Sequence, residues 1–160
     1  MYSTMLESGR SELDMQTQWI INSRRKVTDL SEYLAHNVRC GSCMYFEGDL
    51  GAGKTTLVRS VFRNLGITGA IPSPTFSIME TYTTPDGLEL LHLDLYRIEN
   101  PQELALIGLD EFTKDDWAWF IEWPQNGADI IPDADMRIGL RHAGDARIVE
   151  FPRESDGVLE

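Results

Sequence analysis

The chain has 160 residues, of which 42% are hydrophobic and 25% are charged, a composition typical of one globular domain rather than of a disordered segment. It contains no apolar run near the roughly 20 residues that cross a bilayer, and its first residues show no signal-peptide pattern, so the cytoplasm is the expected location. Its 26 acidic residues against 14 Lys and Arg give a net charge of −12. This balance argues against tight RNA or DNA binding by the chain alone, because such binding depends on basic side chains; any nucleic-acid role would need a more basic partner.

The amino-terminal part predicts a tail followed by the start of the domain. Residues 1–15 are polar and aperiodic, so we expect a disordered tail and a single domain over residues 16–155; Met15 is a candidate natural start. A short strand is predicted at residues 19–21, and Thr28 is the predicted N-cap of the following helix. The apolar residues that recur at helical spacing are Leu30, Tyr33, Leu34 and Val38.

The two cysteines, Cys40 and Cys43, form a C-x-x-C pattern, which can be a redox motif or half of a zinc site. Zinc usually takes four ligands, and the sequence offers neither a second Cys pair nor an H-x₃₋₅-H pattern. We therefore predict a turn that leads into the next strand.

A buried strand is predicted at residues 43–46, a short apolar run that leads directly into the glycine-rich segment 48–56. An amphipathic helix should follow, ending before Gly66, which supplies a glycine stop. Its apolar stripe consists of Leu57, Val58, Val61, Phe62 and Leu65.

The middle of the chain predicts a hairpin. Two prolines stiffen the loop at residues 72–75, and a strand is expected over residues 76–83. Residues 85–87, Pro-Asp-Gly, form a turn because Pro fixes φ and Gly permits a positive φ. The partner strand runs over residues 88–93 and ends at Asp94.

The last third predicts a helix and three more strands. Pro101 is expected to open a helix over residues 102–107, since Pro is favoured at the first helical position. Residues 117–121 form an apolar strand that ends at Glu122. A closing hairpin is predicted from residues 135–140 and 146–151, with residues 142–145 as its turn. Strands alternating with helices around the glycine-rich segment predict an α/β fold with a mixed sheet.

The segment from Gly48 to Thr55 matches the Walker A pattern G-x-x-x-x-G-K-[ST] through Gly48, Gly53, Lys54 and Thr55. Glycines allow successive backbone N–H groups to point at phosphate oxygens, and the following helix directs its positive end to the same place. The lysine reaches the terminal phosphates and the threonine hydroxyl binds Mg²⁺. A chance match is the alternative, but the chain has only three lysines, and the strand before and helix after the motif are those it requires. The motif therefore predicts Mg²⁺-dependent ATP binding, with hydrolysis as the expected activity.

Acidic residues at strand ends are candidates for binding the metal and for orienting the attacking water. Asp94 and Glu122 each end an apolar strand, although either could be an ordinary surface carboxylate, and position alone does not rank them. Thr75 is a third candidate, in a loop that could sense the γ-phosphate or could be a rigid connector.

Two other residues near these carboxylates can each be interpreted in two ways. Trp123 could pack internally or form a contact surface, and Arg97 could stabilise phosphate charge or pair with a neighbouring acid. His92 is interpreted as a structural histidine. Residues 113–116 nearly match the guanine motif N-K-x-D, but they precede a strand rather than follow one, so we interpret them as a solvated turn and favour adenine.

Four segments occur in an order that resembles the TsaE family, the small bacterial ATPases required for threonylcarbamoyladenosine in tRNA; they are residues 48–56, 73–75, 92–97 and 121–124. The likeness covers roughly residues 19–151. The resemblance implies a P-loop three-layer α/β fold with a mixed, mostly parallel sheet and a C-terminal β-hairpin. It also implies an ATPase that is weak alone and acts in a complex with TsaD and TsaB. TsaD modifies adenosine 37 of tRNA, so tRNA would contact this chain only indirectly, and hydrolysis would reset the complex.

The resemblance also implies roles for individual residues. Thr55 and Glu122 would hold Mg²⁺, Asp94 would be a second essential carboxylate near the γ-phosphate, and Thr75 would lie in a switch-like loop. The residues expected to hold the nucleotide are Gly48, Asp49, Gly51, Ala52, Gly53, Lys54, Thr55, Thr56 and Trp123. The family commonly carries a Thr where this chain aligns Val27, so no adenine contact is assigned.

Two other functions are compatible with a Walker A motif. A small-molecule kinase commonly needs arginines on a lid, and the sequence between Thr56 and Trp119 has no arginine cluster. An ATP-gated binding module would be expected to lack a water-positioning acid, whereas this chain offers Asp94 and Glu122.

Overall fold

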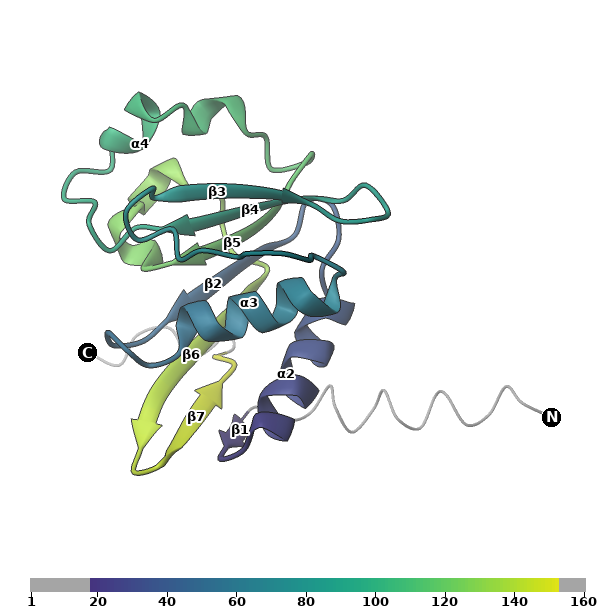
Figure 1. Ribbon diagram of the computed structural model, residues 1–160. Coiled ribbons are helices and arrows are strands. Elements are labelled where there is room, and N and C mark those ends of the chain that lie inside the picture. Colours follow the sequence, from purple (N-terminus) through teal and green to yellow (C-terminus); the bar gives the residue numbers. More distant parts are fainter. Residues whose placement is uncertain (1–17, 153–160) are drawn as a thin grey trace.

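One mixed β-sheet organises residues 18–152, the part of the chain that the computed structural model describes (Figure 1). Its strand order is β1-β7-β6-β2-β5-β4-β3. The strands are β1 (Gln18–Ile21), β2 (Cys43–Glu47), β3 (Met79–Thr83), β4 (Glu89–Asp94), β5 (Ala118–Glu122), β6 (Met136–Ala143) and β7 (Ala146–Glu150). The central strands β6, β2, β5 and β4 are parallel, and the antiparallel pairs lie toward the two edges. The predicted mixed sheet is confirmed; the predicted tail, residues 1–15, and Met15 lie outside the described residues.

Helices and loops cover both faces of this sheet. The α-helices are α2 (Arg24–His36), α3 (Lys54–Asn64) and α4 (Glu103–Leu106), and the 3₁₀ turns are η1 (Leu109–Glu111), η2 (Pro124–Asn126) and η3 (Ala128–Ile130). Helices α2 and α3 pack against one another and share one apolar core with the sheet, whereas α4 and η1 contribute to a second core on the opposite face. Figure 1 shows α2 and α3 lying together, away from α4. The arrangement is the expected three-layer α/β fold. No helix within residues 18–152 is long and apolar enough to cross a membrane.

The alternation of side chains along β4 and β5 decides which residues face α3. Leu90 and Phe120 belong to the core under α2 and α3. Because side chains two residues apart share a face, His92, Asp94 and Glu122 project to this same side of the sheet. Asp94 and Glu122 are direct partners in the parallel register of β4 and β5. The pairing thus brings both predicted carboxylates to one place, beside the start of α3.

The glycine-rich loop, residues 48–53, connects β2 to α3. It depends on backbone conformations that residues other than glycine rarely adopt. Gly48 has φ 145°, and Gly53, the N-cap of α3, has φ 103°. A Cβ atom at Gly48 would collide with the carbonyl oxygen of Leu140 in β6. Helix α3 buries Leu57, Val58, Val61 and Phe62 of the predicted apolar stripe, whereas Leu65 is its C-cap and is only partly buried. The helix ends at Asn64, and Gly66 follows at φ 91°, which confirms the predicted stop.

The predicted N-cap of the first helix is wrong. Ser23, not Thr28, caps α2, since Ser23 has an extended backbone and its hydroxyl accepts from Lys26 N at 3.3 Å. Thr28 lies inside the helix and donates to the Arg24 carbonyl oxygen at 3.2 Å. The first three residues of α2, Arg24, Arg25 and Lys26, are basic and exposed, so the predicted apolar periodicity begins later than the helix does.

The strand predicted at residues 76–83 begins only at Met79. Phe76 is 83% exposed, and residues 74–77 form a turn closed by a hydrogen bond from Ile78 N to the Pro74 carbonyl oxygen at 2.6 Å. Ile78 has φ 67°, a left-handed conformation that is rare for a β-branched residue. The hydrogen bond from Asp94 N to Ile78 O, 2.9 Å, holds this segment against the end of β4, a tertiary contact that local sequence does not encode.

The remaining predictions hold with small changes of boundary. Pro101 opens a helical turn in which the Asn100 and Glu103 side chains cap neighbouring backbone N–H groups, and regular helix follows over α4. The closing hairpin has a tighter turn than predicted, because β6 extends to Ala143 and β7 begins at Ala146. Strand β7 also pairs with β1, which joins the two ends of the described chain.

Candidate functional site

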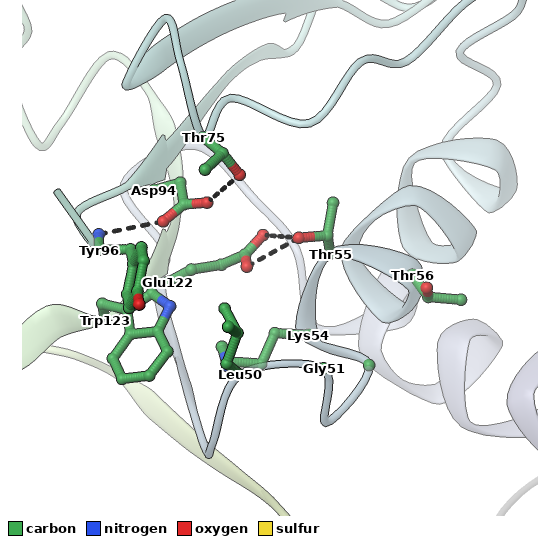
Figure 2. Close-up of a pocket in the computed structure, with 11 residues that line it drawn as sticks. Leu50, Gly51, Lys54, Thr55, Thr56, Thr75, Asp94, Tyr96, Glu122 and Trp123 are labelled. Carbon is green, nitrogen blue, oxygen red and sulfur yellow. Dashed lines mark hydrogen bonds between the residues drawn. The ribbon is translucent and has the colours of Figure 1, made fainter.

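A cavity of about 200 Å³ lies where the glycine-rich loop meets the carboxyl ends of β4 and β5 (Figure 2). Its lining residues are Leu50, Gly51, Gly53, Lys54, Thr55, Thr56, Thr75, Asp94, Tyr96, Glu122 and Trp123. Ligands of open α/β sheets bind outside the carboxyl ends of the strands, so the position is that expected for a binding site.

The Lys54 side chain is enclosed by the loop that precedes it. Its Nζ donates to the carbonyl oxygens of Gly48 at 2.6 Å and Asp49 at 2.8 Å, and it lies 4.3 Å from the centre of the Trp123 ring. Burial lowers the pKa of the Lys54 ammonium, while the nearby carboxylates, Glu122 foremost, oppose that shift. The ammonium is thus poorly hydrated and held by neutral oxygens, an arrangement in which an anionic ligand could bind it strongly.

The side chains of Thr55 and Glu122 meet between α3 and β5. Thr55 Oγ1 lies 2.9 Å from Oε1 and 2.8 Å from Oε2 of Glu122, as Figure 2 shows. Glu122 is only 2% exposed, and its Oε1 also lies 2.8 Å from His92 Nε2. Thr55 occupies the first turn of α3 and Glu122 the last position of β5, so the sheet and the helix fix the two oxygen groups together.

Asp94 connects β4 to the loop at residues 72–78. Thr75 Oγ1 donates to Asp94 Oδ2 at 2.7 Å, and Tyr96 N donates to Asp94 Oδ1 at 3.1 Å. Ser73 Oγ lies 2.8 Å from Thr75 Oγ1 and extends the network. Any movement of this loop would therefore change the hydrogen bonds of a carboxylate in the cavity.

Trp123 directly follows Glu122 and covers one side of the cavity. Its backbone is left-handed at φ 56°, a conformation that costs about 1–2 kcal/mol for a non-glycine residue. The ring contacts Tyr96, with centroids 4.9 Å apart, and faces Lys54. These contacts hold the indole at the mouth of the cavity, where Figure 2 shows it beside Tyr96.

A second cavity, of about 210 Å³, lies on the other side of the glycine-rich loop. It is lined by Ile21, Val27, Leu30, Ala52, Gly53, Thr56, Leu57, Leu140, Arg147 and Val149, a predominantly apolar set. Gly53 and Thr56 line both cavities. Arg147 Nε donates to the Ala52 carbonyl oxygen at 3.1 Å, so β7 supports the loop from this side.

The oxygen groups of Thr55 and Glu122 are hard donors of the kind that Mg²⁺ prefers. Within residues 18–152 no group of three or more His, Cys, Asp or Glu side chains could enclose a metal ion. This donor set fits Mg²⁺, which is usually held by one or two protein groups together with water and substrate phosphates. The C-x-x-C pattern does not form a site: Cys40 is exposed, Cys43 is buried, and both are free.

Most of the predicted site residues line the first cavity; they are Gly51, Gly53, Lys54, Thr55, Thr56, Thr75, Asp94, Glu122 and Trp123. Gly48 and Asp49 contact it only through Lys54, and Ala52 lines the second cavity instead.

The sequence interpretation missed Leu50, Tyr96 and His92 as neighbours of the site. For His92 a signal was available, since it alternates with Asp94 along one strand. Arg97 lies over the Phe76 ring at 4.3 Å and does not line the cavity.

The fold and this arrangement define an α/β protein with a Walker A loop that joins a parallel strand to a helix beside two buried carboxylates. The sequence profile described as "Threonylcarbamoyl adenosine biosynthesis protein TsaE" matches residues 21–149, and the chain belongs to the TsaE family.

Two relatives carry the same description, and one solved structure has a similar fold. The tRNA threonylcarbamoyladenosine biosynthesis protein TsaE of Haemophilus influenzae is 39% identical over 108 residues, which are 68% of each chain. The protein of that name from Bacillus subtilis is 34% identical over 131 residues, 81% of this chain and 80% of the relative. The crystal structure of Bacillus subtilis YdiB superposes with a TM-score of 0.67 at 29% identity and covers 84% of this chain and 82% of that one.

Proposed function

We propose that this protein binds ATP with Mg²⁺ and hydrolyses it in support of tRNA threonylcarbamoyladenosine formation, in the cytoplasm and in a complex with TsaD and TsaB. The observation that carries the proposal is the contact of the Walker A threonine, Thr55, with the buried carboxylate of Glu122. The place in tRNA modification is supported by family membership and by the names of the relatives.

The glycine-rich loop supplies the groups that a triphosphate requires. Positive φ angles at Gly51 and Gly53 allow backbone N–H groups to turn inward, and the amino end of α3 carries partial positive charge. Lys54 would exchange its contacts with the loop carbonyls for phosphate oxygens, which are stronger acceptors.

The two acidic residues of the cavity would have different roles: Glu122 would bind the metal and Asp94 would orient the attacking water. Thr55 and Glu122 would hold Mg²⁺, which neutralises phosphate charge when bound. Asp94 faces the same cavity and would orient the attacking water, while its bond to Thr75 gives the loop at residues 72–78 a means to respond to the γ-phosphate.

The second cavity suits the nucleoside. It is apolar, adjoins the loop, and shares Gly53 and Thr56 with the first cavity, so a nucleotide could occupy both. Apolar walls with few polar groups are typical of sites that bind flat ligands such as a base. Residues 113–116, the near match to the guanine motif, line neither cavity, which supports adenine.

The contacts of the arginines argue against a kinase. Between Thr56 and Trp119 the arginines are Arg59, Arg63 and Arg97. Arg59 and Arg63 donate to backbone carbonyls within residues 67–71, and Arg97 stacks on Phe76. None of the three is held over the cavity as a phosphoryl clamp would be.

Single-turnover hydrolysis of ATP, with and without TsaD and TsaB, tests the proposal. Lys54→Ala should weaken nucleotide binding at least about tenfold, because the phosphates lose a charge-assisted hydrogen bond. Glu122→Ala should reduce Mg²⁺-dependent hydrolysis by about 10²-fold while changing nucleotide affinity much less. Unchanged turnover of Glu122→Ala would refute its assignment, and the absence of any calorimetric signal with Mg-ATP would refute the function.

Asp94→Ala, measured in the same assay, should also lose hydrolysis while binding nucleotide. A pull-down with TsaD and TsaB in ATP and in ADP tests the partners separately. Association that depends on the nucleotide is expected, and association indifferent to nucleotide would contradict coupling of hydrolysis to the complex.

A further inference from the structure

His92 lies directly behind the candidate metal-binding carboxylate and is completely buried. Its side chain projects from β4 toward α3, and its Nε2 lies 2.8 Å from Oε1 of Glu122. Within residues 18–152, the Glu122 carboxylate is therefore hydrogen-bonded to two groups, the Thr55 hydroxyl on one side and the His92 imidazole on the other.

The direction of this hydrogen bond follows from the ionised form of the carboxylate that a metal ligand requires. An ionised carboxylate can only accept, so beside an ionised Glu122 the imidazole proton lies on Nε2 and is donated to the carboxylate. The other ring nitrogen, Nδ1, is buried without a hydrogen-bond partner within residues 18–152. The ring packs edge-on against Phe62 of α3, with centroids 5.6 Å apart at 82°, which fixes its plane.

This environment is unfavourable for a histidine whose only role is to fill space. Its neighbours on the same face of the sheet include Leu90 and Phe120, so an apolar side chain would pack there without an unsatisfied nitrogen. What an apolar residue could not supply is the donor to Glu122. Histidine at this position therefore contributes orientation of the carboxylate rather than stability.

We propose that His92 is a positioning residue for Glu122, which holds Oε1 in a hydrogen bond so that the carboxylate presents its remaining lone pairs, together with the Thr55 hydroxyl, to Mg²⁺. His92 contacts neither nucleotide nor metal in this role. The inference deepens the proposed function and rests on it. Outer groups that orient a metal ligand typically contribute 10- to 100-fold to metal affinity.

Two amide variants of His92 test the inference. The amide nitrogen of His92→Gln can take the place of Nε2, whereas that of His92→Asn ends one carbon shorter and cannot reach Glu122. Each variant is titrated with fluorescent ADP in EDTA and then with Mg²⁺ at fixed ADP. We expect unchanged ADP affinity in EDTA for both, about tenfold weaker Mg²⁺ binding for His92→Asn, and recovery to within about threefold for His92→Gln.

Leu90→Ala is the control for a general loss of core packing, since Leu90 is buried on the same face two residues earlier and pairs with Ala118, four residues before Glu122 on β5. It should melt at a lower temperature yet keep wild-type Mg²⁺ affinity. Equal Mg²⁺ affinities for both His92 variants and the wild type would overturn the inference, as would parallel losses in EDTA and in Mg²⁺. If the wild type itself shows no Mg²⁺-dependent nucleotide binding, the proposed function fails first and the inference falls with it.

Discussion

Four charged or titratable side chains, Lys54, His92, Asp94 and Glu122, are almost completely buried, although such residues are rarely found inside a protein unless they are paired. All four come from the amino end of α3 or from the carboxyl ends of β4 and β5. They form more than half of the seven buried polar residues within residues 18–152. Concentrating buried charge in one place opposes stability, and this supports a functional reason for it.

At the residue scale, the two cysteines should differ in reactivity. Burial raises the pKa of the Cys43 thiol to about 12, so that it remains a protonated, unreactive thiol at pH 8. Cys40 is exposed. An aromatic disulfide reagent should therefore titrate one thiol in the native protein and two in denaturant, and Cys40→Ser should leave none that reacts quickly. Two native thiols reacting at equal rates would contradict the described burial of Cys43.

At the scale of elements, the glycine-rich loop depends on its contact with β6. Gly48→Ala should lower the free energy of unfolding by more than the roughly 1–3 kcal/mol expected for a strained φ, because its Cβ would also collide with the Leu140 carbonyl. Gly69→Ala is the matched control, since Gly69 has φ 77° but no atom within 4 Å of an added Cβ. Urea denaturation compares the two, and equal losses would show that the collision is relieved by a shift of the loop.

The start of α2 offers a second comparison between elements. Ser23→Ala should lower the free energy of unfolding by about 0.5–1 kcal/mol, because it removes the hydroxyl that accepts from Lys26 N. Thr28→Ala, inside the same helix, should change it little, since Ala has the higher helix propensity. Chemical denaturation of both variants distinguishes the two residues. A larger loss at Thr28 would contradict the position of the cap.

At the scale of the whole molecule, the net charge of −12 bears on the proposed relation to tRNA. The purified chain should bind labelled tRNA more weakly than about 10⁻⁴ M at ~150 mM salt, the weak end of ordinary nonspecific binding. Fluorescence anisotropy provides the measurement, and lowering the salt should not produce the strong gain seen for basic proteins. Micromolar binding with a steep salt dependence would contradict the proposal that tRNA contacts this chain only indirectly, through partner proteins.

The sequence by itself determined the features that depend on neighbouring residues. The strand, glycine-rich loop and helix from Cys43 to Asn64 follow from a continuous stretch of about twenty residues, in which apolar spacing and glycine positions encode local structure. The ends of β4 and β5 were predicted for the same reason, because an acid directly follows each apolar run. These local signals also carried the resemblance to the TsaE family.

Only the tertiary structure decided how these segments meet. The register of β4 against β5 places Asp94 beside Glu122, and the packing of α3 on the sheet brings Thr55 to the same carboxylate. The role of His92 and the late start of β3 likewise depend on contacts between distant segments. A pattern of side chains records which face of an element is apolar, but strand neighbours, register and buried hydrogen bonds are selected by packing of the whole chain.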